Sequence, residues 1–143
     1  MASVALRDPA PGTWQLLRER ALGAMDRAYA PYSSFRVGAA LLAADGSIVE
    51  GCNVENAAYP AGMCAERVAV GAAVARGLRD FQALALATEA ETPTPPCGIC
   101  RQVLMEFAPN LSVLSVTREG AEARWTMSDL LPDAFTPTSL GRR

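Results

Sequence analysis

The sequence predicts an α/β domain in which helices cover both faces of a mixed, five-stranded sheet. Apolar residues recur at helical spacing in three segments, 13–29, 64–76 and 97–107. Apolar runs of strand length, bounded by Gly, Pro, Asn or Asp, lie between and after these segments. The predicted order of elements, α-β-β-α-β-α-β-β, is typical of a layered fold with helices packed on a sheet.

The first half of the chain predicts one helix and one hairpin. Thr13 is a suitable N-cap, and apolar residues continue at helical spacing to about Tyr29. The segments 35–43 and 47–52 have the composition of strands, and Asp45-Gly46 between them is a hairpin turn signal. We expect the helix to cover one face of the sheet.

The second half predicts further helices and three strands. The helix 64–76 is ended by Gly77 and has no charged residue over 68–75, so it should be buried on nearly every side. The remaining predicted elements are a strand at 81–88, a proline-rich loop at 89–96, a helix at 97–107, strands at 111–117 and 123–126, and a helical turn at 128–131.

The composition restricts the classes of function. We expect one domain, residues 1–143, with loose tails at 1–12 and 136–143. The net charge is −2 and Lys and Arg are scattered, so no basic surface for nucleic acid is expected. No apolar run suits a signal peptide or a membrane span, and we therefore expect a cytoplasmic protein without a membrane partner.

The chain has no histidine, which excludes several reaction types. Ser-His-Asp and Cys-His hydrolases are ruled out, as are His-ligated zinc enzymes. Proton transfer near neutral pH must then use a carboxylate, a thiol or a metal-bound water. The four cysteines, in a reducing compartment, are better interpreted as metal ligands or buried thiols than as disulfides.

Three of the cysteines have the pattern of a zinc site. Cys64 is followed 33 residues later by Cys97, which pairs with Cys100 in a Cys-x-x-Cys motif. Both motifs fall at predicted helix N-termini, where backbone N–H groups and the helix dipole stabilise thiolates. Three thiolates can hold Zn²⁺ and leave its fourth tetrahedral position free, as catalytic zinc sites do. We therefore predict one zinc ion per subunit on these three cysteines.

Cys52 leaves an alternative open. As a fourth thiolate it would close the site and make the zinc structural, in a non-catalytic protein. It ends a predicted strand 12 residues before Cys64, which is outside the short spacing of paired ligands. We favour the interpretation of Cys52 as a small buried apolar residue.

Two charged residues follow Cys64 closely. Glu66 lies about 200° from Cys64 around an ideal helix, near the metal but not bound to it, which suits a proton shuttle. The alternative for Glu66 is a carboxylate that only stabilises the helix dipole. Arg67 lies on the same helix face as Cys64 and can donate to its sulfur, unless it forms a surface ion pair.

Five sequence motifs between residues 29 and 103 occur together in one known family. They are Tyr29-Ala30-Pro31-Tyr32-Ser33, Val37-Gly38-Ala39-Ala40, Gly51-Cys52-Asn53-Val54-Glu55-Asn56-Ala57-Ala58-Tyr59, Cys64-Ala65-Glu66-Arg67 and Pro96-Cys97-Gly98-Ile99-Cys100-Arg101-Gln102-Val103. In this combination they resemble the small, homotetrameric, zinc-dependent cytidine deaminases with three cysteine ligands. The segment 129–135 resembles the ending of the same family. The resemblance implies a cytidine-deaminase-like, three-layer α/β/α fold.

The resemblance implies hydrolytic deamination of cytidine and deoxycytidine to uridine and deoxyuridine, with release of ammonia, as in pyrimidine salvage. Zinc lowers the pKa of a bound water in this scheme, and the resulting nucleophile attacks C4 of the base. Glu66 takes the proton, passes it to N3 and helps to protonate the departing amino group.

The resemblance also implies the contacts to the substrate. Residues that match Asn53 and Glu55 hold the 3′-hydroxyl of the ribose. A residue that matches Phe35 packs on the base, and the backbone at Ala65 contacts the base as well.

Four further residues acquire expected roles in the same way. Arg67 and Gln102 match groups that lie near the cysteine sulfurs. Tyr59 and Phe135 match aromatic residues that approach the site of a neighbouring subunit. The resemblance therefore implies a homotetramer with sites shared between subunits.

Other substrates fit the same chemistry. An aminonucleoside antibiotic such as blasticidin S is one, and a nucleobase within RNA is another. The run Asn53-Val54-Glu55-Asn56 favours free cytidine over the antibiotic. The Glu55 carboxylate would repel a phosphate placed beside it, and the acidic balance of the chain disfavours RNA.

Overall fold

The centre of the molecule is a mixed sheet of five strands. The computed structural model describes residues 8–142. The strands are β1 (Val37–Ala43), β2 (Ile48–Cys52), β3 (Phe81–Thr88), β4 (Ser112–Thr117) and β5 (Glu122–Thr126). They lie in the order β2-β1-β3-β4-β5. The neighbours β3 and β4 are parallel and the other neighbouring pairs are antiparallel, which confirms the predicted mixed sheet.

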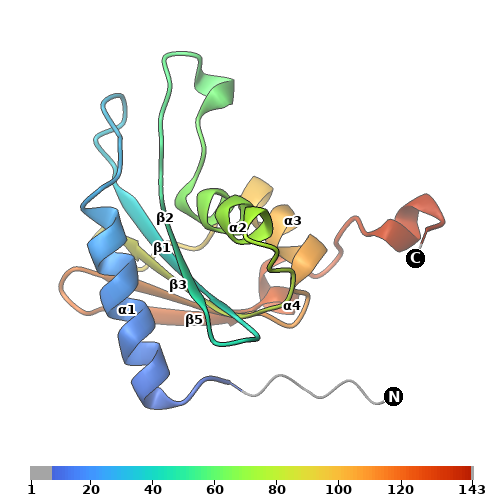
Figure 1. Cartoon of the computed structure of the whole chain (residues 1–143). Helices are drawn as coiled ribbons and strands as arrows, with labels where there is room; N and C mark the ends of the chain where they lie inside the picture. Colours follow the sequence, from blue (N-terminus) through green and yellow to red (C-terminus); the bar gives the residue numbers. More distant parts are fainter. Residues whose placement is uncertain (1–7, 143) are drawn as a thin grey trace.

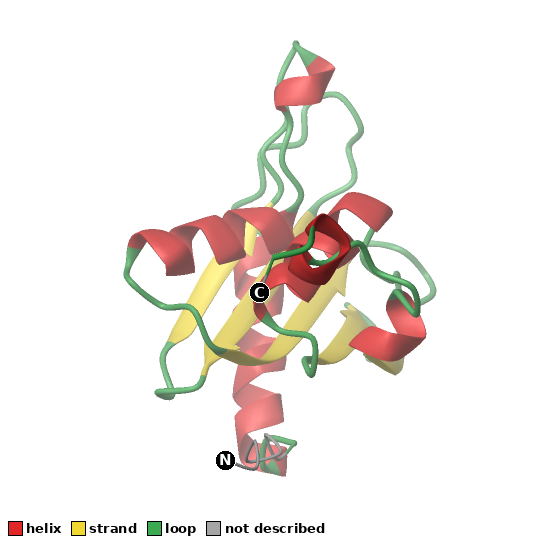
Figure 2. Ribbon diagram, turned by 90° about the vertical axis from the view of Figure 1, so that its right-hand side faces the viewer, coloured by secondary structure: helices red, strands yellow, loops and turns green. Residues whose placement is uncertain are grey.

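Helices cover both faces of this sheet, so the prediction of three layers is confirmed (Figures 1 and 2). The helix α1 (Pro11–Met25) packs on one face. The helices α2 (Ala65–Ala75), α3 (Gly98–Phe107) and the short α4 (Met127–Leu130) pack on the other. No helix within residues 8–142 is long and apolar enough to cross a membrane.

Strand β1 is buried on both faces because successive side chains point into different cores. Ala39 and Leu41 belong to the core under α2 and α3, whereas Ala40 and Leu42 belong to the core under α1. Alternate side chains of a strand point to opposite faces, so a central strand covered on both sides is apolar throughout. This explains why the sequence of β1 contains no polar residue between Val37 and Ala43.

Two glycines allow the helices to lie directly on the strands. A Cβ at Gly38 would lie 2.0 Å from the carbonyl oxygen of Ala21 in α1. A Cβ at Gly51 would lie 2.4 Å from the carbonyl oxygen of Ala65, at the start of α2. No side chain fits at either position, so these contacts set how closely both helices approach the sheet.

The helix α1 differs from its predicted bounds at both ends. It begins at Pro11, with Ala10 as N-cap, because the fixed φ of proline suits the first turn and its missing N–H is not needed there. It ends at Met25, four residues before Tyr29. Tyr29 instead pairs with Val54 in a parallel bridge, and its carbonyl accepts the Glu55 N–H at 2.9 Å. This tertiary pairing overrides the helical periodicity.

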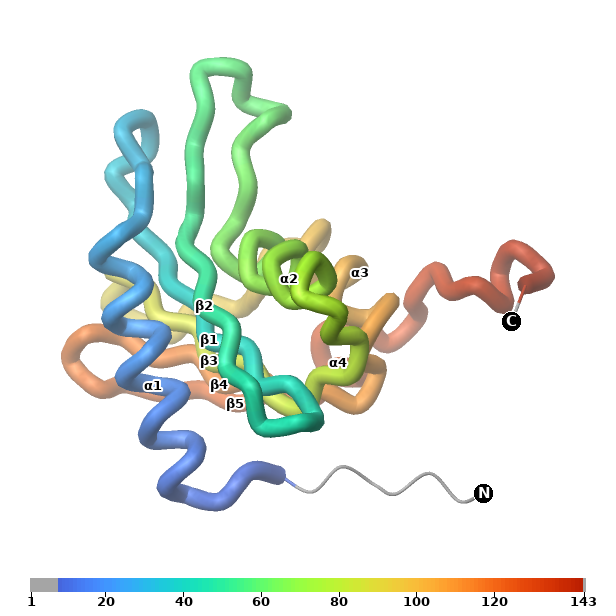
Figure 3. Tube along the Cα trace, in the orientation of Figure 1, coloured from blue at the N-terminus to red at the C-terminus, as the bar shows by residue number. Residues whose placement is uncertain are grey.

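The loops at one end of the sheet project beyond it. From β2 the chain makes an excursion over residues 53–63, which contains the 3₁₀ turn Tyr59–Ala61, and returns to α2 (Figure 3). Strand β1 begins at Val37, two residues later than predicted, and Ser34 ahead of it has a left-handed φ of 57°. A non-glycine residue adopts this conformation only where its surroundings impose it.

The two segments predicted to be loose tails are partly regular. Pro11 and Gly12 form the first turn of α1, and Pro137–Leu140 form a 3₁₀ helix. Residues 1–7 and 143, which belong to the same predicted tails, lie outside the described residues.

The close contact at Gly38 yields a stability prediction. We expect Gly38→Ala to lower the free energy of unfolding by at least about 2 kcal/mol, because the methyl group would overlap the backbone of α1. The matched control is Gly71→Ala in α2, where a Cβ meets nothing within 4 Å. This substitution should be neutral or stabilising by about 0.5–1 kcal/mol, because alanine suits a helix interior better than glycine. Urea unfolding of both variants measures the difference, and equal stabilities would contradict the packing argument.

Candidate zinc centre and pocket

Two helix starts bring three cysteine sulfurs together. Cys64 is the N-cap of α2 and Cys97 is the N-cap of α3, while Cys100 lies in the first turn of α3. The sulfur atoms of the three residues lie within 4.8 Å of one another, and those of Cys64 and Cys97 are 3.7 Å apart. The predicted positions at helix N-termini are therefore confirmed. Cys52, at the end of β2, is not part of this cluster.

The geometry and the acid–base properties of the cluster fit Zn²⁺. Zn–S bonds of about 2.3 Å in a tetrahedron place sulfurs about 3.8 Å apart, close to the separation of Cys64 and Cys97. Hydrogen bonds from Cys100 and Arg67 lower the pKa of Cys64 to about 5. The same contact with Cys64, together with burial, raises the pKa of Cys100. Thiolates so close repel one another, and a divalent cation between them removes this obstacle to ionisation.

Glu66 lies beside the cluster without belonging to it. It is in the first turn of α2, only 5% of its surface is exposed, and its side chain lines the adjoining pocket. Burial, with a further contribution from the charge of Cys64, raises the pKa of Glu66 to about 7. A carboxyl group in this range can both take and give a proton near neutral pH.

Arg67 points back toward the cluster, as the helix spacing predicted. Its Nη2 lies 3.9 Å from the sulfur of Cys64 and donates to the carbonyl of Gly62 at 3.3 Å. Its Nε is buried and has no hydrogen-bond partner. A buried donor without a partner is costly, and a negatively charged metal–thiolate cluster would satisfy it.

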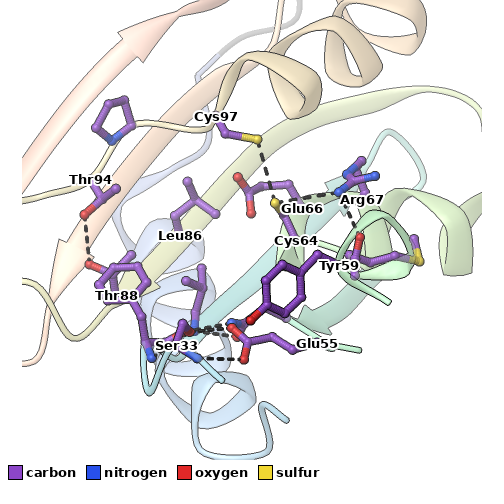
Figure 4. A pocket seen from close by; sticks show the side chains of 16 residues that line it. Ser33, Glu55, Tyr59, Cys64, Glu66, Arg67, Leu86, Thr88, Thr94 and Cys97 are labelled. Carbon is purple, nitrogen blue, oxygen red and sulfur yellow. Dashed lines mark hydrogen bonds between the residues drawn. The ribbon is translucent and has the colours of Figure 1, made fainter. Parts of the chain in front are cut away.

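A pocket of about 330 Å³ opens beside the sulfurs. This volume is in the range of small-molecule sites. The walls come from four parts of the chain, within residues 33–37, 53–67, 86–88 and 94–97. Figure 4 shows Cys64, Cys97 and Glu66 at one end of the pocket, and Glu55 with Ser33 at the other.

The sequence matches the family model of the cytidine and deoxycytidylate deaminase zinc-binding region over residues 13–115. This span includes the three cysteines, Glu66 and all four walls of the pocket. The chain belongs to this deaminase family.

Similar proteins agree with this assignment. A cytidine deaminase from Halalkalibacterium halodurans is 46% identical over 85% of this chain and 93% of its own length. The crystal structure of a cytidine deaminase from Burkholderia pseudomallei has a TM-score of 0.82 at 48% identity, covering 85% of this chain and 98% of that one. A blasticidin-S deaminase from Bacillus cereus is more distant, at 29% identity over 70% of this chain and 76% of its own length. The predicted deaminase fold and the zinc-binding character of the chain are thus confirmed.

The two residues of this deaminase that are expected to hold the sugar also form hydrogen bonds to the backbone around the pocket. Asn53 accepts the Val37 N–H and donates to the Phe35 carbonyl, both at 2.8 Å. Glu55 accepts the N–H groups of Tyr32 and Ser33 at 2.9 and 3.0 Å, and the hydroxyl of Ser33 as well. The bonds from Ser33 and Tyr32 keep the pKa of Glu55 below its usual range, so it is a carboxylate. Both residues line the pocket and retain hydrogen-bonding capacity toward it.

The remaining expected site residues are more scattered. Phe35 and Tyr59 line the pocket, although 75% of the Tyr59 surface is exposed. Ala65 is fully buried as the first residue of α2. The amide of Gln102 donates to the carbonyl of Phe135 at 2.7 Å, a different contact from the expected one near the sulfurs. Phe135 itself is 60% exposed and is not part of the pocket of its own chain.

Sequence reasoning missed one wall of the pocket. Leu86 and Thr88 from the end of β3 line it, together with Thr94 from the loop before Cys97. The hydroxyls of Thr88 and Thr94 are 3.2 Å apart, and Thr88 is only 1% exposed. A polar residue directly after the apolar run 83–87 of an interior strand was the available signal for Thr88.

The cysteine cluster yields a prediction of zinc content. We expect Cys100→Ala to lose its bound zinc and Cys52→Ala to keep about one ion per chain, because three thiolates suffice for an open site. Elemental analysis of purified protein measures the metal, and circular dichroism establishes that both variants are folded. Loss of zinc from Cys52→Ala would instead indicate a closed, structural site with four thiolates.

Proposed function

We propose that this chain is a zinc-dependent enzyme that deaminates cytidine and deoxycytidine to uridine and deoxyuridine by hydrolysis, with release of ammonia. The observation that carries the proposal is the buried Glu66 beside a three-sulfur cluster, at the inner end of a pocket of about 330 Å³. The relatives named cytidine deaminase, which the chain covers almost completely, support the same activity.

Zinc held by Cys64, Cys97 and Cys100 supplies a Lewis acid that makes water a nucleophile at neutral pH. Glu66 moves the protons. It would take the first proton from the attacking water and deliver it to N3 of the base. It would then take the proton of the hydroxyl group added at C4 and deliver it to the amino group, which leaves as ammonia while C4 becomes a carbonyl. The pKa of about 7 suits this exchange, because the carboxyl group is readily found in either protonation state.

The outer half of the pocket is proposed to bind the sugar. Asn53 and Glu55 would hold the 3′-hydroxyl, and Phe35 would pack on the base. The fixed carboxylate of Glu55 suits a hydroxyl donor and disfavours a phosphate, which supports a free nucleoside as substrate rather than RNA. Ala65 is proposed to offer its backbone N–H to the base, since the first N–H groups of a helix have no partner within the helix.

The site is further proposed to be shared between the subunits of a homotetramer. Tyr59 and Phe135 would each extend toward the pocket of a neighbour. Their exposure of 75% and 60% leaves both side chains accessible for such a contact. The hydrogen bond from Gln102 to the Phe135 carbonyl would hold the C-terminal segment in place for this contact.

We also propose that residues 1–143 act as a single deaminase domain in the cytoplasm, in the salvage of pyrimidine nucleosides. The substrate chemistry supports this setting, because deamination returns cytidine to the uridine pool.

The activity is tested by the loss of ultraviolet absorbance when purified protein meets cytidine. We expect turnover that a strong zinc chelator abolishes on prolonged incubation. Glu66→Gln should keep its zinc and lower kcat by at least about 10²-fold, the usual contribution of a general acid–base. Zinc-loaded protein that leaves cytidine and deoxycytidine unchanged would refute the proposed substrate, and an active Glu66→Gln would refute the proton shuttle.

The shared site is tested at Phe135. We expect Phe135→Ala to raise KM for cytidine by roughly fivefold, as the loss of one aromatic contact does. Leu140→Ala is the matched control, since Leu140 is equally exposed at 64% in the same C-terminal segment. Sedimentation velocity should give a tetramer for both variants. A stable, fully active monomer would rule out the sharing of sites.

A further inference from the structure

An ion pair lies directly behind the pocket wall. Arg36 donates from Nε and Nη2 to Oε1 of Glu89, at 2.8 and 2.5 Å. The two residues continue the β1–β3 ladder one step beyond its last pair, Val37 and Thr88. Because side chains alternate along a strand, Arg36 and Glu89 point away from the pocket while Phe35, Val37 and Thr88 line it.

The same carboxylate also holds backbone. Oε2 of Glu89 accepts the N–H of Arg36 at 3.2 Å. The N–H of Phe35 donates to the hydroxyl of Ser33 at 3.0 Å, and Asn53 binds the Phe35 carbonyl and the Val37 N–H. Side chains therefore replace strand partners over three consecutive residues, 35–37, at the start of β1. Glu89 holds this segment from the side opposite to the pocket.

A second arginine ties this pair to the rest of the fold. Arg118, in the turn between β4 and β5, donates to Asp26 at 2.7 Å and lies 3.7 Å from Oε1 of Glu89. Asp26 is the C-cap of α1. The side chains of Arg36 and Glu89 are only 39% and 25% exposed. A partly buried pair with two N–H donors and a backbone contact restrains geometry more than an isolated surface pair does.

We propose that Arg36 and Glu89 are a positioning pair, which fixes the pocket wall formed by Phe35, Val37 and Thr88 for nucleoside binding. This inference rests on the proposed nucleoside deaminase activity. Neither residue touches the pocket, so the pair acts through its neighbours in the chain. A wall that contacts substrate and transition state alike contributes uniform binding, which changes KM and leaves kcat nearly constant.

The test is the variant Glu89→Leu, which removes both the ion pair and the acceptor of the Arg36 N–H. We expect KM for cytidine to rise roughly tenfold, as for the loss of a charge-assisted hydrogen bond, with kcat within about twofold of the parent. The Kd of uridine, measured by calorimetry without turnover, should rise by the same factor. Zinc content should remain unchanged.

Two further variants separate positioning from stability. Glu89→Gln keeps an oxygen that can accept the Arg36 N–H, and it should restore most of the lost affinity. Arg118→Ala removes the outer contacts to Asp26 and Glu89 while leaving Arg36 and Glu89 paired. It is expected to lower the melting temperature without a change in KM. An equal rise of KM in Arg118→Ala and Glu89→Leu would overturn the proposal.

Amide hydrogen exchange on substrate-free protein provides a readout that does not depend on the activity. The Val37 N–H, which is bound to Asn53 rather than to Glu89, should exchange faster in Glu89→Leu. Unchanged exchange at Val37, with unchanged KM and uridine Kd, would show that the pair contributes only stability. Absence of cytidine turnover in the parent protein would refute the proposed function instead, and the exchange of Val37 would still decide the positioning role.

Discussion

Three cysteine sulfurs that repel one another when ionised lie within 4.8 Å, and much of the fold serves this arrangement. The starts of α2 and α3 must converge, because Cys64 and Cys97 are their N-caps. Gly51 lets α2 lie directly on β2. The helix α3 connects the parallel strands β3 and β4, so the sheet sets its position as well. Both helix N-termini then direct unpaired N–H groups and positive dipole ends toward the thiolates.

The pocket beside the sulfurs depends on side-chain hydrogen bonds to irregular backbone rather than on helix packing. Its outer wall is irregular backbone with a left-handed Ser34, which a strand ladder cannot stabilise. The side chains of Asn53, Glu55 and Glu89 accept backbone N–H groups of this segment. A polar group that is already hydrogen-bonded to the protein does not rearrange when a ligand arrives. The wall is thereby set before binding, which reduces the entropy lost in forming the complex.

The two ends of the pocket have contrasting environments. Glu66 at the inner end is buried and its pKa is raised, whereas Glu55 at the outer end is half-buried and its pKa is lowered by hydrogen bonds. The raised pKa allows Glu66 to gain or lose a proton near neutral pH, and the lowered pKa keeps Glu55 charged. Opposite pKa shifts of two carboxyl groups in one pocket are a common basis for assigning acid–base and binding roles.

The sequence alone determined the fold class, the order of the elements and the cysteine cluster, since these follow from apolar periodicity and from ligand spacing along the chain. It did not determine the end of α1, where the bridge from Tyr29 to Val54 stops the helix early. Nor did it indicate the contact of Gln102 with Phe135, or the pairing of Arg36 with Glu89, 53 residues apart. Local patterns report which face of an element is buried. Contacts between segments far apart in sequence depend on strand register and helix approach, which only the tertiary structure decides.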